Sequence, residues 1–189
     1  MSKNRILLNK IESFEKVNSN LVNLVLILIG TLLLAISAKV QVPFWPVPMT
    51  MQTFVVFLIG MTYGVRLSLF TLLLYLFEGA IGIPVFASGG GLAYLIGPTA
   101  GYLYGMTFAV VIISYLANKG FSTSYIKATF SLLLGTIVIF VLGILYLGSI
   151  IGYSKAIQAG LLPFIPSEIF KIALAVAIVP TLHNFIKTK

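Results

Sequence analysis

Residues 79–102 read GAIGIPVFASGGGLAYLIGPTAGY, a glycine-rich segment broken by proline that lies between two long apolar runs. Backbone amide and carbonyl groups cannot stay unpaired in lipid, so an irregular segment beside membrane spans occurs only where it faces water, packs within protein or lines a cavity. One interpretation is a simple connector between helices. Connectors seldom contain aromatic side chains that can stack on a ligand, whereas this segment contains Phe86, Tyr94 and Tyr102. We therefore predict a ligand-binding loop.

The composition around this segment is that of an integral membrane protein. Of the 189 residues, 59% are hydrophobic and 8% are charged, against about 25% charged residues in soluble domains. The mean hydropathy is +1.10. Cysteine is absent and there is one histidine, which excludes disulfides, thiolate metal sites and multi-histidine metal sites. We expect no metal and no nucleic acid partner, because most basic residues lie beside apolar runs and indicate orientation in a lipid bilayer.

The apolar runs predict an all-α fold, with an N-terminal arm at residues 1–20 and one domain of six transmembrane helices at residues 21–189. The expected helices cover about 21–38, 50–63, 66–78, 95–117, 126–149 and 164–186. The second and third are short, so they could form a hairpin or contain broken turns. No small-residue cleavage site closely follows the first run, and we expect that run to remain as the first span.

Basic residues predict the orientation of this domain. Six crossings place both termini on one side, and that side would hold nine of the twelve lysines and arginines. The positive-inside rule then places the termini and the arm in the cytoplasm. The loops at 39–50, 79–94 and 150–163 would face outward, and they are the richest in proline, glycine and aromatic residues. We expect these three loops to roof one outward-facing pocket.

Glu168 and Lys171 are the main candidates for polar ligand contacts. They lie three residues apart in PFIPSEIFK, so both side chains fall on one face at the start of the last predicted helix. Ionisable groups at membrane depth cost about 2.5–3.5 kcal/mol, and they usually face a cavity and have a function. A structural interpretation is also open, in which Ser167 caps the helix, Glu168 favours the positive end of the helix dipole and Lys171 pairs with it. The two interpretations are compatible.

Other polar and small residues leave alternatives open. Gln52 can donate and accept hydrogen bonds at once, which suits an amide or ureide ligand, but it could equally join two helices. Trp45 could contact a ligand or lie in an interfacial aromatic belt. Gly101 and Gly105 recur at helical spacing and allow close packing, either within the bundle or against a partner. No phosphate-binding loop, HExxH motif or GxSxG motif is present, so we expect no catalytic residue and an energy source on another subunit.

Three segments together resemble one known family. They are VPMTMQTF at 47–54, YLFEGAIGIPVFASGGGLAYLIGPTAGYLYG at 75–105 and GLLPFIPSEIFKIALA at 160–175. In this order and spacing they resemble the BioY family, the biotin-specific substrate-binding (S) components of energy-coupling factor (ECF) transporters. The family usually has Gly-Asp where this chain has Ser167 and Glu168, so a carboxylate is retained with a side chain one methylene longer.

The resemblance implies a multi-pass ECF S-component-like bundle in the cell membrane, without enzymatic activity. It would capture biotin from outside with high affinity, with no cofactor, and would act with a transmembrane coupling protein and two cytoplasmic ATPase subunits. Glu168 would accept the ureido hydrogens of biotin, and Lys171 would serve either the ureido carbonyl or the carboxylate. The candidate substrate-binding residues are Glu168, Lys171, Gly89, Gly90, Gly91, Phe86, Tyr102, Gln52 and Trp45. The alternatives are another vitamin as the ligand, or a small intramembrane enzyme that uses Glu168 as a general base.

Overall fold

The protein is a helical bundle, and the computed structural model describes residues 19–187. Residues 1–18 of the predicted N-terminal arm therefore lie outside the described residues. The longer helices are α2 (Ser19–Lys39), α3 (Gln52–Thr62), α4 (Val65–Ala80), α6 (Ala100–Asn118), α7 (Tyr125–Ile151) and α9 (Ile165–Lys187). The shorter elements are α5 (Leu92–Leu95), α8 (Tyr153–Gly160), η1 (Phe121–Thr123) and η2 (Leu162–Phe164), with an antiparallel pair of strands β1 (Gln41–Val42) and β2 (Met49–Thr50).

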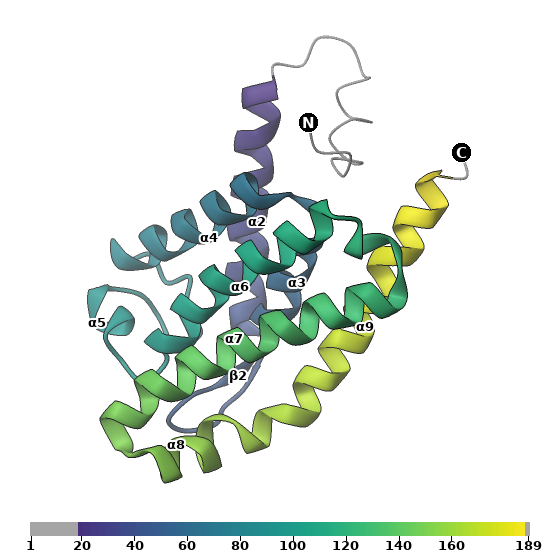
Figure 1. The fold of residues 1–189 in the computed structure, drawn as a ribbon. Helices are drawn as coiled ribbons and strands as arrows, with labels where there is room; N and C mark the ends of the chain where they lie inside the picture. The colour runs from purple at the N-terminus through teal and green to yellow at the C-terminus, as the bar shows by residue number, and fades with distance from the viewer. Residues whose placement is uncertain (1–18, 188–189) are drawn as a thin grey trace.

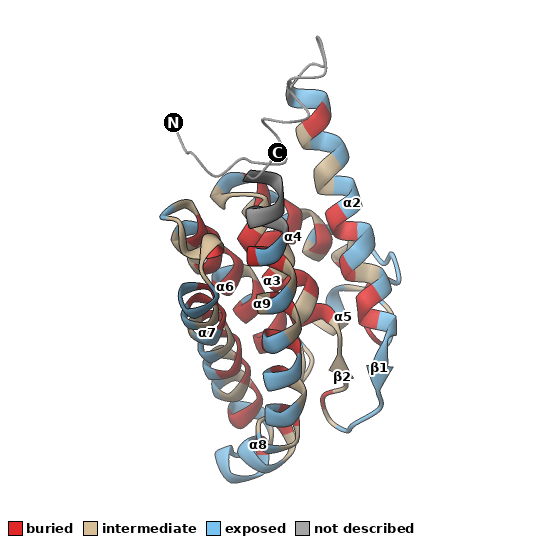
Figure 2. Ribbon diagram, turned by 90° about the vertical axis from the view of Figure 1, so that its right-hand side faces the viewer, coloured by how far each residue is buried: buried red, intermediate tan, exposed pale blue. Residues whose placement is uncertain are grey.

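The helices run between two ends of the bundle. The beginning of α2 and the end of α9 lie at one end, here called the terminal end (Figure 1). The short helix α8 and the turn between β1 and β2 lie at the opposite end, here called the hairpin end (Figures 1 and 2). The segments that connect α2 to α3 and α7 to α9 are therefore brought to the same end of the molecule.

Four helical stretches of the described residues are long and apolar enough to cross a membrane, and they cover residues 20–39, 100–118, 125–151 and 153–181. The helix α3 has 11 residues and α4 has 16. At 1.5 Å per residue they extend about 17 and 24 Å, which is less than the roughly 30 Å of a bilayer core. The predicted helical fold is thus present with four candidate membrane spans, and membrane crossing by α3 and α4 stays a prediction.

Exposed residues lie on the outside of the long helices and buried residues face the bundle interior (Figure 2), and many of the exposed residues are large and apolar. Leu32 on α2 is 59% exposed, Phe108 on α6 is 60% exposed and Phe170 on α9 is 62% exposed. Soluble monomers rarely expose contiguous apolar surface of this extent. In a bilayer, the same side chains contact lipid tails.

Glycine and proline set the ends of the helices that form the site. Gly120 follows α6 with a φ of 89° and Gly152 follows α7 with a φ of 88°, a backbone conformation that other residues seldom adopt. Pro163 precedes α9 and Pro166 lies in its first turn, where proline loses no intrahelical hydrogen bond. As a result, Glu168 and Lys171 fall in the first two turns of α9.

The helices α6 and α7 pack with their backbones in direct contact. A Cβ atom on Gly105 would lie 2.8 Å from the Cα of Ile139, and one on Gly101 would lie 2.6 Å from the carbonyl oxygen of Leu142. Both distances are shorter than any real Cβ contact, so no larger residue fits at either position without displacement. The small-residue face predicted at Gly101 and Gly105 is therefore used inside the bundle.

Candidate small-molecule binding site

A pocket opens between the loops and the helices α3, α6, α7 and α9. The space free of protein atoms is about 510 Å³ including its open mouth, and about 40 Å³ of it admits the centre of a water molecule. The narrow part therefore holds only a few waters, and a larger guest requires the surrounding side chains to move. The lining residues are Val47, Pro48, Thr50, Gln52, Thr53, Phe86, Ala87, Tyr94, Thr99, Tyr102, Leu103, Met106, Ile139, Phe140, Phe164, Glu168 and Lys171.

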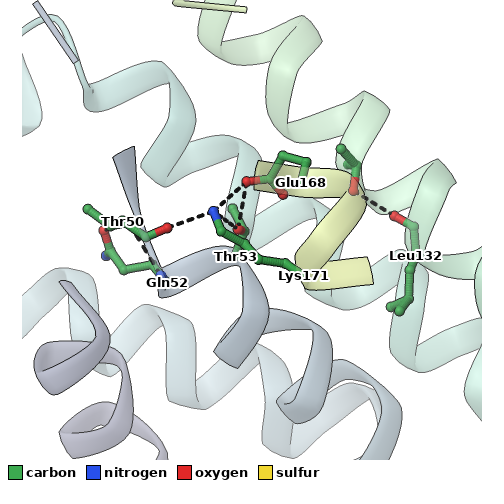
Figure 3. A network of polar contacts seen from close by, with 7 residues as sticks. Thr50, Gln52, Thr53, Leu132, Glu168 and Lys171 are labelled. Atoms are coloured by element: carbon green, nitrogen blue, oxygen red, sulfur yellow. Dashed lines mark hydrogen bonds and ion pairs between the residues drawn. The ribbon is translucent and has the colours of Figure 1, made fainter. Parts of the chain in front are cut away.

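A buried ion pair lies at the polar side of this pocket. The Lys171 Nζ atom is 2.6 Å from Glu168 Oε1, as expected for residues three positions apart on one helix. Glu168 is 4% exposed and Lys171 is 2% exposed. Figure 3 shows both side chains reaching from α9 toward Thr50 and Thr53, which lie in β2 and at the start of α3. Two distant parts of the chain thus form one polar cluster.

All three N–H groups of the Lys171 ammonium are matched by oxygen atoms of the chain. Besides the bond to Glu168, Lys171 Nζ donates to the carbonyl oxygen of Thr50 at 2.7 Å and to Thr53 Oγ1 at 3.0 Å. The Thr53 hydroxyl in turn donates to Glu168 Oε1 at 2.9 Å. An ammonium carries three donors and no acceptor. Lys171 can therefore contact a ligand only by exchanging one of these bonds.

Glu168 has one oxygen atom that the network leaves open. Its Oε1 atom accepts from both Lys171 and Thr53, whereas its Oε2 atom is buried and has no hydrogen-bond partner among the described residues. An unpaired buried acceptor costs the desolvation free energy of that atom, and the cost is larger for a charged group. A ligand N–H group that reaches Oε2 would remove this cost. The site is thus suited to a hydrogen-bond donor.

A second hydrogen-bonded group connects the start of α3 with the loop after α4. Gln52 accepts a bond from Thr50 Oγ1 at 2.9 Å and donates through Nε2 to the hydroxyl of Tyr75 at 2.8 Å. Tyr75 then donates to the carbonyl oxygen of Val85 at 2.9 Å. The Gln52 amide is therefore engaged within the bundle, although it also lines the pocket. Its second N–H group is the part that could serve a ligand.

Aromatic rings form the apolar side of the pocket. Tyr102 on α6 is stacked on Phe164, with ring centroids 6.5 Å apart, and meets Phe140 edge to face at 5.9 Å. The Tyr102 hydroxyl donates to the carbonyl oxygen of Gly160 at 2.8 Å. These contacts fix the ring planes, because a buried tyrosine both packs and hydrogen-bonds. A flat apolar ligand can lie against this surface.

Phe86 lines the pocket from the irregular loop at residues 82–91. Its side chain is fully buried and stacked on Tyr94, with ring centroids 4.8 Å apart and an interplanar angle of 25°. The ring occupies the space that a side chain at residue 79 would fill, since a Cβ on Gly79 would lie 1.9 Å from Phe86. Glycine at 79 therefore permits the loop to fold back onto α4.

The structure brings five of the nine predicted site residues to one pocket: Gln52, Phe86, Tyr102, Glu168 and Lys171. It does not bring Trp45 there. Trp45 is 86% exposed and lies at a separate surface groove with Lys155 and Gln158. The predicted loop at 150–163 also supplies none of the lining residues, although its Gly160 accepts the bond from Tyr102.

The glycine triplet also lies outside the lining. The amide of Gly89 donates to the carbonyl oxygen of Phe86 at 3.3 Å, and the amide of Gly91 donates to that of Gly79 at 2.6 Å. A Cβ on Gly90 would lie 2.3 Å from the carbonyl oxygen of Ile83. These glycines allow the loop to fold tightly. Contact between the triplet and a ligand stays a prediction, as does contact with Trp45.

Three threonines that line the pocket, Thr50, Thr53 and Thr99, were not predicted as site residues, and Thr53 is the one whose side chain contacts both Glu168 and Lys171. It is separated by 115 residues from Glu168, the carboxylate to which it donates. Its position directly after Gln52, in the segment VPMTMQTF, was the one available signal. Among the described residues, no group of three or more histidine, cysteine, aspartate or glutamate side chains could hold a metal ion.

The fold and the pocket together define a helical membrane protein with a binding site for a small molecule that has both polar donors and an apolar body. Comparison with known proteins identifies the group more closely. The chain belongs to the BioY family, whose model matches residues 10–188. The match covers every described helix and all residues that line the pocket.

Individual relatives span most of the chain. A probable biotin transporter BioY of Rickettsia prowazekii is 32% identical over 88% of this chain and 86% of its own length. A probable biotin transporter BioY of Pyrococcus horikoshii is 37% identical over 80% of this chain and 90% of its own length. Among solved structures, an S-component for biotin from an ECF-type ABC transporter is similar with a TM-score of 0.78 and 26% identity, and the match covers 89% of this chain and 95% of that one.

Proposed function

We propose that this chain captures biotin on the outer side of the cell membrane and serves in biotin uptake as the substrate-specific subunit of an ATP-driven ECF transporter. It performs no chemistry on its ligand. The relatives named as biotin transporters and the solved biotin S-component support this proposal. The structural observation that carries it is the open Oε2 atom of Glu168, a buried acceptor on a residue that lines a pocket together with aromatic and aliphatic side chains.

Biotin has the two features that this pocket requires. Its cyclic urea carries two N–H donors, and its fused rings present a flat surface of low polarity. One urea N–H would pair with Glu168 Oε2, which lacks a partner among the described residues. The rings would lie between Phe86 and Tyr102, which line the pocket from different elements. The polar contact provides specificity and the aromatic contact provides buried area.

Lys171 holds Glu168 in place in this proposal. Its three donors are matched by Glu168, Thr53 and the Thr50 carbonyl, so it orients the carboxylate and balances its charge. Direct contact between Lys171 and the ligand, as the sequence predicts, requires the exchange of one of these bonds. Binding that used this exchange would break the Lys171 bond to the Thr50 carbonyl or to Thr53.

Calorimetry with purified protein and biotin tests the proposal. The intact chain should bind biotin at submicromolar concentration, and other vitamins should not compete. Glu168→Gln should weaken binding by at least about 30-fold, because loss of one member of a buried charged pair costs about 2–5 kcal/mol. No binding of biotin by the intact chain at micromolar concentration would end the proposal. Competition by a different vitamin at lower concentration would reassign the ligand.

A matched double variant separates ligand binding from folding. Glu168→Gln combined with Lys171→Met removes both charges and leaves no buried charge unpaired, a replacement that is often neutral or stabilising. This variant should unfold at a temperature close to that of the intact chain and should still fail to bind biotin. Retained binding in a folded double variant would show that the pair has only a structural role.

We further propose six crossings with both termini in the cytoplasm, which places α8 and the hairpin end outside. The start of α2 and the end of α9 lie at the same end of the bundle, as an even number of crossings requires (Figure 1). The sequence contains no cysteine, so single cysteines can be placed at will. Gln158→Cys on α8 should react with an impermeant maleimide in intact cells, and Thr123→Cys in η1 should react only after lysis. The reverse pattern of reaction would show that the termini lie outside the cell, contrary to this proposal.

The proposed partners are a transmembrane coupling protein and two cytoplasmic ATPase subunits. The similarity to an S-component of an ECF-type ABC transporter supports this assembly. Co-expression with such subunits and affinity purification through this chain should recover all three. Biotin uptake in vesicles should then require ATP on the cytoplasmic side. Uptake by the purified chain alone, at the same rate, would contradict the need for partners.

A further inference from the structure

Three consecutive carbonyl groups in the loop at residues 82–91 are held by side chains from three other elements. The carbonyl oxygen of Val85 accepts from the hydroxyl of Tyr75 on α4 at 2.9 Å. The carbonyl oxygen of Phe86 accepts from Lys39 Nζ, at the end of α2, at 2.5 Å. That of Ala87 accepts from Gln41 Nε2, in β1, at 3.3 Å. The loop backbone is thus fixed by side-chain donors.

The position of these bonds relates them to the pocket. Phe86 and Ala87 line it from the loop after α4, while Val47, Pro48 and Thr50 line it from the segment between α2 and α3. Gln41 lies in that same segment, and Lys39 is the last residue of α2, where the segment begins. Their two bonds, here called the clasp, therefore tie together the two irregular segments that flank the pocket.

The donors of the clasp are more exposed than the buried ammonium group of Lys171. Lys171 is 2% exposed and its bonds lie within the bundle, whereas Lys39 and Gln41 are exposed residues. Water can compete for the clasp donors, so these bonds can break and reform while the helices stay packed. Because about 40 Å³ of the pocket admits the centre of a water molecule, a ligand larger than a few waters requires the surrounding residues to move, and an open clasp frees two of them, Phe86 and Ala87.

We propose that the clasp formed by Lys39 and Gln41 on the carbonyls of Phe86 and Ala87 sets the rates of ligand entry and exit. The inference rests on the proposed function, since it concerns access to the same pocket. Lys39 and Gln41 act as positioning residues: they hold the loop that contains Phe86 and do not touch the ligand. In this proposal the clasp restricts passage into the pocket equally when the pocket is empty and when it is occupied. Its loss therefore accelerates association and dissociation together and changes the dissociation constant little.

Rate measurements with radiolabelled biotin test this inference. Lys39→Met removes the donor and keeps the aliphatic chain, and it should raise both rate constants by about tenfold, in line with the loss of one charge-assisted hydrogen bond. Lys39→Arg retains a donor and should restore slower rates. Lys155→Met is the matched control, because Lys155 is an exposed lysine on α8 that does not line the pocket. Unchanged rates in Lys39→Met, or a tenfold change in the dissociation constant alone, would overturn the inference.

Hydrogen exchange provides a readout that needs no ligand. In Lys39→Met, the amides of residues 85–88 should exchange about tenfold faster than in the intact chain, while those of α6 and α7 keep their rates. This result would be expected even if the pocket took a ligand other than biotin, so the failure of the clasp and the failure of the proposed function are distinguishable. Equal exchange at residues 85–88 in both proteins would contradict the clasp.

Cross-linking tests the clasp in the opposite way, because it holds the two segments together instead of releasing them. Gln41→Cys and Ser88→Cys place two thiols on the paired segments of a chain that otherwise has none, and Ser88 is exposed and does not line the pocket. A short bifunctional cross-linker should trap bound biotin until the cross-link is cleaved. Free exchange of biotin in the fully cross-linked protein would show that entry does not require the two segments to part.

Discussion

The two sides of the pocket are held in different ways. On the helical side, Tyr102 and Phe140 come from α6 and α7, whose backbones are in contact through glycine. On the loop side, Phe86 and Ala87 belong to an irregular segment whose carbonyl groups each accept a bond from one side chain of another element. The packing of α6 against α7 involves many residues. Each side-chain hydrogen bond to a loop carbonyl, by contrast, is lost when one donor is removed. The comparison teaches that the helical side gives the pocket its shape and the loop side can move to admit a ligand.

The largest expected effect is a loss of stability from a substitution on the helical side, where α6 packs against α7. Gly105→Ala adds a Cβ atom 2.8 Å from the Cα of Ile139, and backbone cannot yield as a flexible side chain does. We expect a loss of about 3 kcal/mol in the free energy of unfolding, measured by thermal unfolding in detergent. Gly97→Ala is the matched control, since its new atom would lie 3.4 Å from its nearest neighbour. Equal unfolding temperatures for the two variants would contradict close contact between α6 and α7.

The next effect concerns the loop side. Tyr75→Phe removes the hydroxyl that donates to Val85 and accepts from Gln52, and each buried group left unpaired costs about 1–3 kcal/mol. The amides of residues 85–87 should lose protection from hydrogen exchange, whereas those of α6 and α7 should keep theirs. Loss of protection in α6 and α7 as well would show that the loop side cannot open independently of the helical side.

A paired substitution sharpens the comparison. Phe86→Leu and Phe140→Leu change a buried aromatic residue on the loop side and on the helical side, respectively. Phe140→Leu should lower both the affinity for biotin and the unfolding temperature, with a stability loss of about 1.5 kcal/mol. Phe86→Leu should lower the affinity by a similar factor with a smaller change in unfolding temperature, because the loop can rearrange locally. Equal losses of stability would argue against a movable loop.

The smallest effect is expected at Trp45. This residue is 86% exposed and does not line the pocket, so Trp45→Phe should change the dissociation constant for biotin by less than about twofold. Calorimetry provides the check. A loss of affinity of tenfold or more would place Trp45 at the ligand, as the sequence predicts.

The sequence predicted the long helices well because they are long apolar runs. The last run was expected at about 164–186, and α9 covers Ile165–Lys187. The run expected from 95 begins as α6 only at Ala100, because Pro98 disfavours helical backbone at the residue before it. The helix α8 was missed within the predicted loop at 150–163, since its eight residues lie between Gly152 and Pro163, which read as loop signals.

Contacts within the site were predictable only where they are local. The spacing of Glu168 and Lys171 predicts their ion pair, and the pair is present. The bonds from Thr53 to Glu168 and from Gln52 to Tyr75 join segments that lie far apart in the chain, and no periodicity in a single sequence encodes such pairing. The exposure of Trp45 depends in the same way on how the loop folds.

The most direct test of the account is a crystal structure of this protein with biotin bound. The account predicts a urea nitrogen of biotin within about 2.7–3.2 Å of Glu168 Oε2, with the fused rings between Phe86 and Tyr102. Biotin bound at another place, with Glu168 Oε2 still buried and unpaired, would contradict it.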